Sequence, residues 1–343
     1  MGSLDTSNHT ESLLFLGASG QVGGAFLTIF RKAHPTIPIT AYLRSTTLDA
    51  ALTALGNTTV IHGTFEEFDK VENLASTHSI IINCAASFNP PLTEAILKGI
   101  RATKITSHRK PILLHLSGTG NFVDHSTTGS YVPPKNLFND ANPDQVRKID
   151  ASYPPNGATD ELILKAAAAG DVNAFFVCPG GIYGNSSNHL GRSVGDKSAE
   201  AAGVWVLWNT ENVAGLGFSP FVGEGTSIIR LVHVDDVVAL MMLVLKKAVE
   251  VWDEYMPEDV FKNFYVAVEE EPYKAKPVAE AYADLLWRRG NIAKAVVRSV
   301  KFEEAGKVAG YIAGNTQVKN DNAKSLGWKA RDGGFFETLK VSK

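Results

Sequence analysis

Two hydroxyl-bearing residues stand at positions suited to chemistry in this chain of 343 residues. Ser117 directly follows the apolar run 112–116, and Tyr153 lies a few dozen residues further on, just ahead of a helix-like segment at 158–169. Both side chains can donate and accept hydrogen bonds, and a tyrosine can also transfer a proton to or from a reacting group. Whether the two residues share a site depends on the elements that hold them.

Those elements follow a regular order. Short apolar runs alternate with helix-like segments, which is typical of a parallel sheet covered by helices on both faces. The expected strands of this sheet are 12–16, 37–43, 59–62, 80–85, 112–116, 174–177 and 263–268. We therefore predict an α/β fold with a doubly wound parallel sheet of the Rossmann type and a smaller, interleaved C-terminal substrate lobe.

The expected boundaries divide the chain between two lobes. Residues 12–184 and 228–268 form the predicted nucleotide-binding domain, and residues 185–227 and 269–343 form the predicted substrate-binding lobe. Within the second lobe we expect a helix at 301–310. Aromatic residues that would either line a cleft or fill the core of this lobe are Trp205, Trp208, Phe218 and Phe221.

The first strand is followed by a glycine-rich turn, "GASGQVGG", which opens a helix-like segment. Glycines at these spacings allow a tight turn, a close approach of backbone to phosphate and close packing of helix on strand. The exposed amides at the start of the helix favour an anionic pyrophosphate. We expect a dinucleotide here; the alternative is a tight turn without a ligand. The predicted cofactor-binding residues of the turn are Gly17, Ser19, Gly20, Gln21, Val22 and Gly23.

The end of the second strand favours NADP(H) over NAD(H). A free ribose is usually held there by an acidic residue, whereas a 2′-phosphate needs a cation. The sequence "TAYLRST" places Arg44 and Ser45 at this end, and the first acid is Asp49. An arginine can pair with a phosphate through two parallel hydrogen bonds. The alternative role for Arg44 is that of a solvated arginine at a strand end.

Several motifs occur in the order of one known family. They are "GASGQVGG", "NCAAS" at 83–87, "HLSGTG" around Ser117, "CPGGIYG" at 178–184, "VGEGTSIIRLVHVDDVVAL" and "LGW" near the end of the sequence. With these motifs the chain resembles the extended short-chain dehydrogenase/reductase family, and more narrowly its atypical, NmrA-like and fungal-type members. The resemblance covers most of the chain and implies further cofactor contacts at Ala85, Ala86, Ser87, Pro179, Gly180 and Ile182.

The resemblance also implies roles for the two hydroxyl-bearing residues. The serine of the family hydrogen-bonds the substrate oxygen, which corresponds to Ser117. The tyrosine exchanges a proton with the substrate, and a lysine one helical turn on holds the ribose and lowers the pKa of the tyrosine. If Tyr153 is that tyrosine, the lysine position is Gly157. Ser117 and Tyr153 are therefore the predicted catalytic residues of a non-standard active site, and a lysine restored at 157 would be expected to raise carbonyl-reductase activity.

A second placement of the tyrosine–lysine motif competes with this one. Counting back from Lys165 puts Glu161 in the tyrosine position and leaves few residues before Pro179. Counting from Tyr153 gives a spacing that fits the family and places Glu161 where the family often has a glutamate. We prefer the placement that counts from Tyr153. Lys165 then lies two helical turns beyond the motif, roughly 12 Å along the helix, and is expected to be solvated.

Four histidines occur where a role in or near the site can be considered. His115 alternates within a strand and is expected to be a satisfied core residue, and His233 is expected to hold the start of a helix together with Asp235. His125 and His189 lie in loops near the expected site, where either would be able to touch a substrate.

The bulk composition excludes several classes of function. A net charge of −3 gives no basic surface for nucleic acid or for an anionic membrane. Two cysteines, Cys84 and Cys178, lie in apolar runs and are expected to be buried thiols rather than a disulfide or a metal site. The polar N-terminal residues lack the apolar core of a signal peptide, so we expect a cytoplasmic protein. An oligomer is not indicated.

Three hypotheses of function follow. The first is an NADP(H)-dependent oxidoreductase acting on a bulky, largely apolar small molecule, for which the resemblance suggests a natural-product intermediate. The second is an enzyme of the same fold that binds NADP(H) but catalyses a redox-neutral or redox-coupled isomerisation or cyclisation, which the loss of the lysine at Gly157 favours. The third is a non-enzymatic, NmrA-like regulator that senses NADP and binds a protein partner.

Overall fold

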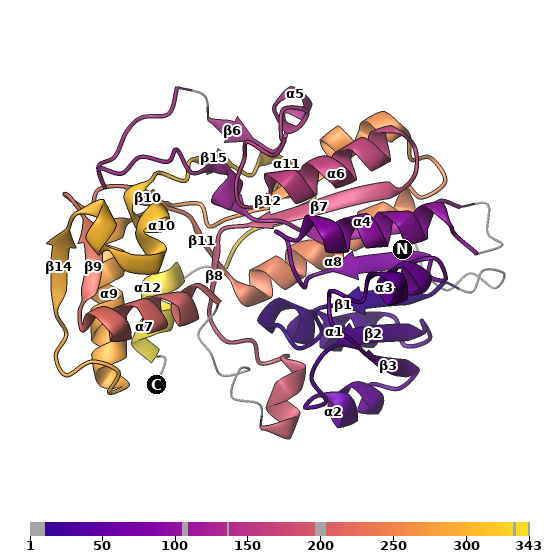
Figure 1. The fold of residues 1–343 in the computed structure, drawn as a ribbon, viewed down its shortest axis with the longest axis horizontal. Coiled ribbons are helices and arrows are strands. Elements are labelled where there is room, and N and C mark those ends of the chain that lie inside the picture. Colours follow the sequence, from indigo (N-terminus) through magenta and orange to yellow (C-terminus); the bar gives the residue numbers. More distant parts are fainter. Residues whose placement is uncertain (1–10, 105–108, 136, 196–203, 332–333, 342–343) are drawn as a thin grey trace.

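A seven-stranded parallel sheet forms the centre of the larger lobe (Figure 1). The computed structural model describes residues 11–104, 109–135, 137–195, 204–331 and 334–341. The strands of the sheet are β1 (Leu13–Leu16), β2 (Ile39–Leu43), β3 (Thr58–His62), β4 (Ile80–Asn83), β5 (Ile112–Leu116), β7 (Asn173–Pro179) and β12 (Phe264–Ala267). Their spatial order is β12-β7-β5-β4-β1-β2-β3, and each neighbouring pair is parallel. The predicted Rossmann-type fold is confirmed.

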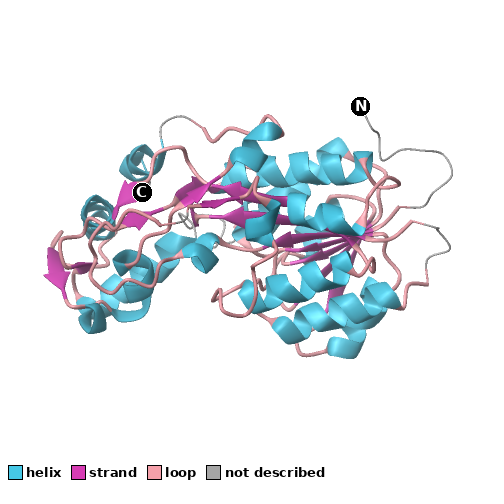
Figure 2. Cartoon of the chain, turned by 90° about the horizontal axis from the view of Figure 1, so that it is seen from above, coloured by secondary structure: helices cyan, strands magenta, loops and turns pink. Residues whose placement is uncertain are grey.

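Helices cover both faces of this sheet, as Figure 2 shows. Side chains of β1 alternate between two cores: Leu13 and Phe15 belong to one, Leu14 and Leu16 to the other. The first core is covered by α1 (Gln21–Ala33), α2 (Asp49–Ala54) and α8 (Val234–Glu250). The second is covered by α3 (Phe68–Ala75), α4 (Pro90–Arg101) and α6 (Gly157–Ala168). Burial on both faces explains why these strands read as continuous apolar runs.

The strand order reverses at β1, which lies between β4 and β2. In doubly wound sheets a ligand binds beside such a switch point, at the carboxyl ends of the strands. The glycine turn after β1, the tip of β2 and the ends of β4 and β5 therefore meet at one edge of the sheet.

A smaller lobe lies beyond this edge and has its own apolar core, which includes Tyr282, Leu285, Ile312 and Phe335 (Figure 1). It contains β9 (Ser219–Val222) paired with β14 (Val297–Val300), together with α7 (Val204–Leu216), α9 (Ala275–Arg288), α10 (Ala309–Ala313) and α12 (Gly334–Val341). Short strand pairs near the junction are β8 (Gly181–Tyr183) with β11 (Leu231–His233), β10 (Ile228–Ile229) with β13 (Tyr273–Lys274), and β6 (Phe138–Asn139) with β15 (Val318–Lys319).

The remaining helical elements are short. They are η1 (Thr119–Phe122), α5 (Pro143–Val146), η2 (Leu190–Val194), η4 (Pro257–Lys262), η5 (Phe302–Glu304), η6 (Gly306–Val308) and α11 (Asp321–Ser325). Within the described residues, none of the helices has the length and apolar character that a membrane crossing requires.

Two segments differ from the expected layout. The helix predicted over 301–310 is broken at Gly306, whose φ of +75° is left-handed and ends any right-handed helix. The segment 318–328 was assigned to the substrate lobe, but Ala323 and Trp328 pack in a core of the larger lobe, and the Trp328 indole donates to the Asp236 carbonyl at 2.9 Å. We therefore place that segment with the nucleotide-binding lobe.

Candidate functional site

The turn between β1 and α1 leaves no room for side chains at its glycines. Gly17 has a φ of +97°, and a Cβ there would lie 2.7 Å from the carbonyl carbon of Cys84 at the end of β4. A Cβ at Gly23 would lie 2.1 Å from the Gly17 carbonyl oxygen. Gly20 precedes α1 at the N-cap position and has no side chain with which to cap the first amides of that helix. These residues fit a pyrophosphate, which can approach the bare backbone and receive hydrogen bonds from the amides.

Two side chains brace this turn against a distant part of the chain. The Gln21 side chain donates to the Gly184 carbonyl at 2.8 Å. The Nε2 atom of His189 lies 3.2 Å from the Gly20 carbonyl oxygen, and its Nδ1 atom accepts from the Gly191 amide at 3.0 Å. The side chain of Gln21, a predicted cofactor residue, is thus engaged with the scaffold. His189, which we expected near a substrate, packs beside the nucleotide turn instead.

The tip of β2 presents an exposed cation. The Arg44 guanidinium lies 5.7 Å from the centre of the Phe65 ring, and the Ser45 hydroxyl lies 2.8 Å from that of Thr47. The carboxylate of Asp49 is held by His62, with Oδ2 at 3.0 Å from Nε2. One oxygen of Asp49, the first acid after β2 in the sequence, therefore contacts another side chain, whereas Arg44 and Ser45 are exposed and could receive a phosphate.

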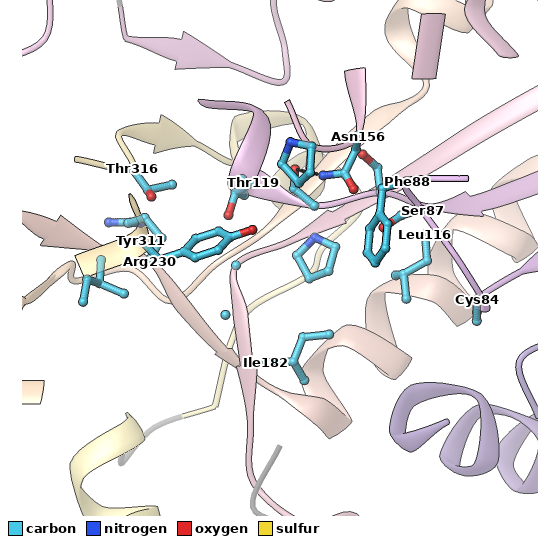
Figure 3. Close-up of a pocket in the computed structure, with 18 of the residues that line it drawn as sticks. Cys84, Ser87, Phe88, Leu116, Thr119, Asn156, Ile182, Arg230, Tyr311 and Thr316 are labelled. Atoms are coloured by element: carbon cyan, nitrogen blue, oxygen red, sulfur yellow. Dashed lines mark hydrogen bonds between the residues drawn. The ribbon is translucent and has the colours of Figure 1, made fainter. Parts of the chain in front are cut away.

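A cavity of about 230 Å³ opens at the carboxyl ends of β4, β5 and β7 (Figure 3). Among the described residues that line it, Arg230 is the only charged one, and most of the others are apolar or glycine. The structure brings together here the predicted site residues Ala85, Ser87, Ser117, Pro179, Gly180 and Ile182. Ala86 and Tyr153 do not line it, and the Val22 side chain packs in the core.

Ser117 is coupled to a carboxyl group that the sequence analysis did not single out. The Ser117 hydroxyl donates to Oδ2 of Asp160 at 2.7 Å, and the Asn121 amide donates to the same oxygen at 2.8 Å. Asp160 has no exposed surface, and burial raises its pKa to about 7, although both hydrogen bonds oppose this shift. The signal in the sequence was an acidic residue on the apolar face of α6, at helical spacing from Ile163 and Leu164.

His115 lies behind this carboxyl group and is fully buried, as expected, but it is not the satisfied core histidine that the sequence predicted. Its Nε2 atom is 3.6 Å from Oδ1 of Asp160, and within the described structure neither atom has a hydrogen-bond partner. Burial lowers the pKa of His115 to about 3, so the imidazole is neutral at pH 7. The pair is therefore a neutral histidine beside a carboxyl group rather than an ion pair, because desolvation outweighs the attraction of two buried charges.

Tyr153 lies in a different cavity from Ser117. This second cavity of about 710 Å³ is formed in part by Phe122, Pro134 and Lys148, and the Tyr153 ring packs edge-on against Phe122 with ring centres 6.2 Å apart. The residues two and three positions further on, Pro155 and Asn156, line the first cavity instead. The predicted catalytic role of Tyr153 stays a prediction, and the structure does not bring its ring to the cavity that Ser117 lines.

The backbone excludes a lysine at position 157. A Cβ at Gly157 would lie 2.1 Å from the Asp150 carbonyl oxygen and 2.9 Å from the Tyr153 Cβ. The expectation that a lysine restored here would raise activity is therefore wrong for this backbone, because even an alanine would force the turn to move. Lys165 is exposed and pairs with Glu161 at 2.5 Å, as expected for a solvated helix lysine.

The smaller lobe contributes a phenol to the first cavity. Tyr311, on α10, lines it, and Figure 3 shows its ring reaching inward with the hydroxyl end toward Thr119. Burial raises the pKa of Tyr311 above its ordinary value, so the phenol is protonated at neutral pH. Nothing in the local sequence identified this residue, because its place in the site depends on how the two lobes pack.

Other expected residues have scaffold positions. His125 is exposed and lines neither cavity, and His233 accepts from the Asp235 amide at 3.1 Å at the start of α8, as expected. Phe218 and Phe221 stack against Arg298 and Lys276 and do not line the first cavity. The side chains of Trp205 and Trp208 lie outside the described residues. Both cysteines are free thiols, buried at Cys178 and half-buried at Cys84.

Solved structures of other proteins share this fold. The dTDP-glucose 4,6-dehydratase of Bacillus anthracis, in complex with NAD, gives a TM-score of 0.62 at 15% identity over 97% of this chain and 95% of its own. The UDP-glucose 4-epimerase of Thermotoga maritima, with UDP-glucose, gives 0.60 at 14% identity over 96% and 97% of the two chains. The terminal R domain from the myxalamid PKS-NRPS biosynthetic pathway gives 0.57 at 14% identity over 98% and 90%. At such identities the likeness shows the fold alone.

Comparison of the sequence with curated proteins found no match. A family model, in contrast, matches residues 13–255, which extend from β1 through α8 and so include the glycine turn, Ser117 and the whole of α6. The expected relationship to the extended short-chain dehydrogenases/reductases is confirmed at this level, and the chain belongs to the NAD-dependent epimerase/dehydratase family.

Proposed function

We propose that this protein is an NADP(H)-dependent oxidoreductase that acts on a bulky, largely apolar small molecule. The observation that carries the proposal is the position of Ser117, in the wall of a mostly apolar cavity at the carboxyl ends of the central strands. A cavity with apolar walls and a few placed polar groups suits a small molecule of this kind, because the walls hold its body and a hydroxyl fixes an oxygen. The resemblance to fungal-type members supports a natural-product intermediate as the substrate.

The chain has residues that fit two parts of the cofactor, its pyrophosphate and its 2′-phosphate, and the cofactor would supply or accept the hydride when bound. The turn from Gly17 to Gly23 suits the pyrophosphate, because its backbone is bare and α1 starts there. Arg44 and Ser45 suit the 2′-phosphate of NADP(H), because the nearby Asp49 is held by His62. The preference for NADP(H) over NAD(H) rests on this tip of β2.

Two hydroxyl groups would then donate hydrogen bonds to the substrate. Ser117 would donate to the reacting oxygen, and Tyr311 would offer a second donor from the other lobe. Thr119 lines the same cavity, and Figure 3 shows the Tyr311 hydroxyl pointing toward it. We infer that the substrate is held between the lobes, with its oxygen toward β5.

A redox-neutral reaction is the second candidate. It is favoured by the geometry at Gly157, which rules out the lysine that would tune a tyrosine for proton transfer. In that case NADP(H) would be bound while the substrate is isomerised or cyclised without net loss of the reduced cofactor. A non-enzymatic, NmrA-like sensor would instead bind a protein partner in a nucleotide-dependent way.

The deciding experiment has two stages. The purified protein is titrated with NADPH and with NADH, and binding is followed by nicotinamide fluorescence. A panel of bulky ketones and alcohols is then screened, with NADPH consumption and product formation recorded separately. Selective binding of NADPH with turnover that Ser117→Ala abolishes supports the proposal. Product without loss of NADPH identifies the redox-neutral reaction, and failure to bind either nucleotide contradicts both.

A further inference from the structure

The Ser117 hydroxyl is the outer end of a buried polar chain. It is 5% exposed and lines the cavity, whereas Asp160, to which it donates at 2.7 Å, has no exposed surface. Asn121 donates to the same carboxyl oxygen and so fixes the orientation of that group. The carboxyl group is thus one hydrogen bond away from any oxygen that contacts Ser117.

The far side of Asp160 determines which of its oxygens carries a proton. Asn83 accepts from the Ala85 amide through Oδ1 at 3.1 Å, which turns its NH₂ group toward Nδ1 of His115 at 3.4 Å. Nδ1 is then the acceptor, so the hydrogen of the neutral ring lies on Nε2, which faces Oδ1 of Asp160 at 3.6 Å. A proton on Oδ1 would meet that hydrogen. The acidic proton of Asp160 is therefore placed on Oδ2, and in that state the hydrogen bond to the serine reverses: Oδ2–H donates to Oγ of Ser117, while the same oxygen still accepts from Asn121. The Ser117 hydrogen is then available to an oxygen in the cavity.

We propose that Asp160 and Ser117 form a proton relay between the protein interior and the reacting oxygen of the substrate. The proposal rests on the oxidoreductase function above and deepens it. In reduction, a bound reduced nicotinamide would supply the hydride to the carbonyl carbon, and the carbonyl oxygen would form a bond to the Ser117 proton. Ser117 in turn takes the proton from Oδ2 of Asp160, which becomes a carboxylate and is reprotonated from water before the next turnover. Oxidation of an alcohol runs the same transfers in reverse.

The groups packed against Asp160 leave it as the one that titrates near neutral pH. His115 on β5 is held neutral by burial, which lowers its pKa to about 3. Burial likewise raises the pKa of the Cys178 thiol on β7 well above its usual value, so the thiol keeps its proton. The pKa of Asp160 lies at about 7, close to the working pH that suits a proton donor. A neutral carboxyl group needs no lysine beside it, so the proposed relay does not require the lysine that is missing at Gly157.

The first test uses the protein without cofactor or substrate. Infrared difference spectra are recorded from about pH 5 to about pH 9, a range that includes the shifted carboxyl and excludes ordinary surface carboxylates. We expect a protonated-acid band that titrates near pH 7 and is absent in Asp160→Asn but kept in Asp140→Asn, which removes the other buried aspartate that titrates in this range, near pH 6. In Ser117→Ala the band should titrate at a higher pH, because the hydrogen bond that favours the carboxylate is lost. A band that does not titrate in this range, or does so unchanged in Ser117→Ala, overturns the relay.

The second test uses NADPH and phenanthrenequinone, a bulky apolar dicarbonyl, as the probe. The kcat for reduction should fall as the pH rises through about 7, because the relay then lacks its proton, and oxidation of a bulky alcohol should show the opposite profile. Asp160→Asn should lower kcat by about 10²–10⁴-fold and flatten both profiles, since an amide cannot supply a proton. Equal pH profiles in wild type and Asp160→Asn overturn the proposal.

Asp140 provides a matched control. It is another buried aspartate, with a pKa that burial raises to about 6, but its partners are the backbone amides of Val266, Asn322 and Ala323. Asp140→Asn should leave the kinetic pH profile in place even if it lowers stability. If the wild type shows no turnover at all, the oxidoreductase function fails, while the infrared titration still decides whether Asp160 and Ser117 share a proton.

Discussion

Oγ of Ser117 and Oδ2 of Asp160 are 2.7 Å apart, and the two residues come from elements on different sides of the cavity wall, the end of β5 and the first turn of α6. The contact links the site to the protein interior, because Asp160 is fully buried among His115, Asn121 and Cys178. The hydrogen-bonding capacity of the serine is thereby tied to the protonation state of a carboxyl group that a substrate does not touch.

Arg44→Ala should weaken NADPH binding by about 10- to 100-fold and NADH binding little, because hydrogen bonds to a charged group contribute about 1.5–3 kcal/mol each. The measurement is a fluorescence titration with each nucleotide. Arg298→Ala is the matched control, since this arginine also stacks on a phenylalanine, Phe218, but lies in the other lobe. Equal losses for the two nucleotides would remove the assignment of Arg44 to a 2′-phosphate.

Gly23→Ala should abolish dinucleotide binding and lower the stability of the fold. The new Cβ would lie 2.1 Å from the Gly17 carbonyl oxygen, so the turn must open and move its amides. Nucleotide titration and urea unfolding measure the two effects. Gly215→Ala is the control, because its Cβ would meet nothing within 4 Å on α7. Wild-type affinity in Gly23→Ala would show that the close packing of this turn is not required.

Tyr311→Phe should lower kcat/KM for a bulky ketone by up to about tenfold, the value of one neutral hydrogen bond. Because the ring remains, the loss should not extend to stability. The informative comparison is with Tyr153→Phe, measured on the same substrate. A larger loss in Tyr153→Phe would restore the role that the family resemblance gives to Tyr153 and would argue against Tyr311.

The stability of Asp160→Asn should depend on pH more steeply than that of the wild type below pH 6.5. The pKa of Asp160 is 3.8 in the unfolded chain and about 7 in the folded protein. Its contribution to the free energy of unfolding is therefore lost as the pH rises from about 3.8 to about 7. The lowered pKa of His115, 6.5 unfolded and about 3 folded, removes stability as pH falls through its own window. Where the windows overlap, the two slopes have opposite signs and offset each other.

Without Asp160, only the histidine slope remains, so the free energy of unfolding should fall by up to about 1.4 kcal/mol for each pH unit below pH 6.5. Urea unfolding at a series of pH values measures it. His115→Gln should show the reverse trend, with stability falling as pH rises from about 4 to about 7. If the free energy of unfolding depended on pH in the same way in both variants, neither group would have the shifted pKa described above.

Sequence patterns predicted the fold well because its elements are local. The strands were visible as apolar runs, and the turn after β1 required glycine at two close approaches that only the backbone can make. Ser117 was found because it follows a strand. Gly306 escaped notice because its left-handed φ follows from packing against Asn212, far away in the sequence.

The rest of the site depends on the directions of side chains and on the distances between them, which the spacing of residues in the sequence does not reveal. Tyr153 lies at the expected place in the chain, but the course of the turn directs its ring into the second cavity. Asp160 was not among the predicted site residues, although its position on the apolar face of α6 was the available signal. Tyr311 belongs to the smaller lobe but lines the cavity of the larger one, and no local sequence pattern predicts that the two lobes pack in this way.

The short turn before α6 separates two cavities, with Tyr153 on one side and Pro155 and Asn156 on the other. For protein engineering, this means that a catalytic side chain introduced at position 153, where the sequence motif places it, would enter the second cavity and not the first. A side chain introduced at 155 or 156 would reach the cofactor side, whereas changes at 153 would reshape the larger neighbouring chamber. Positions 155 and 156 offer a way to vary the substrate pocket while the sequence of the nucleotide turn after β1 is left unchanged.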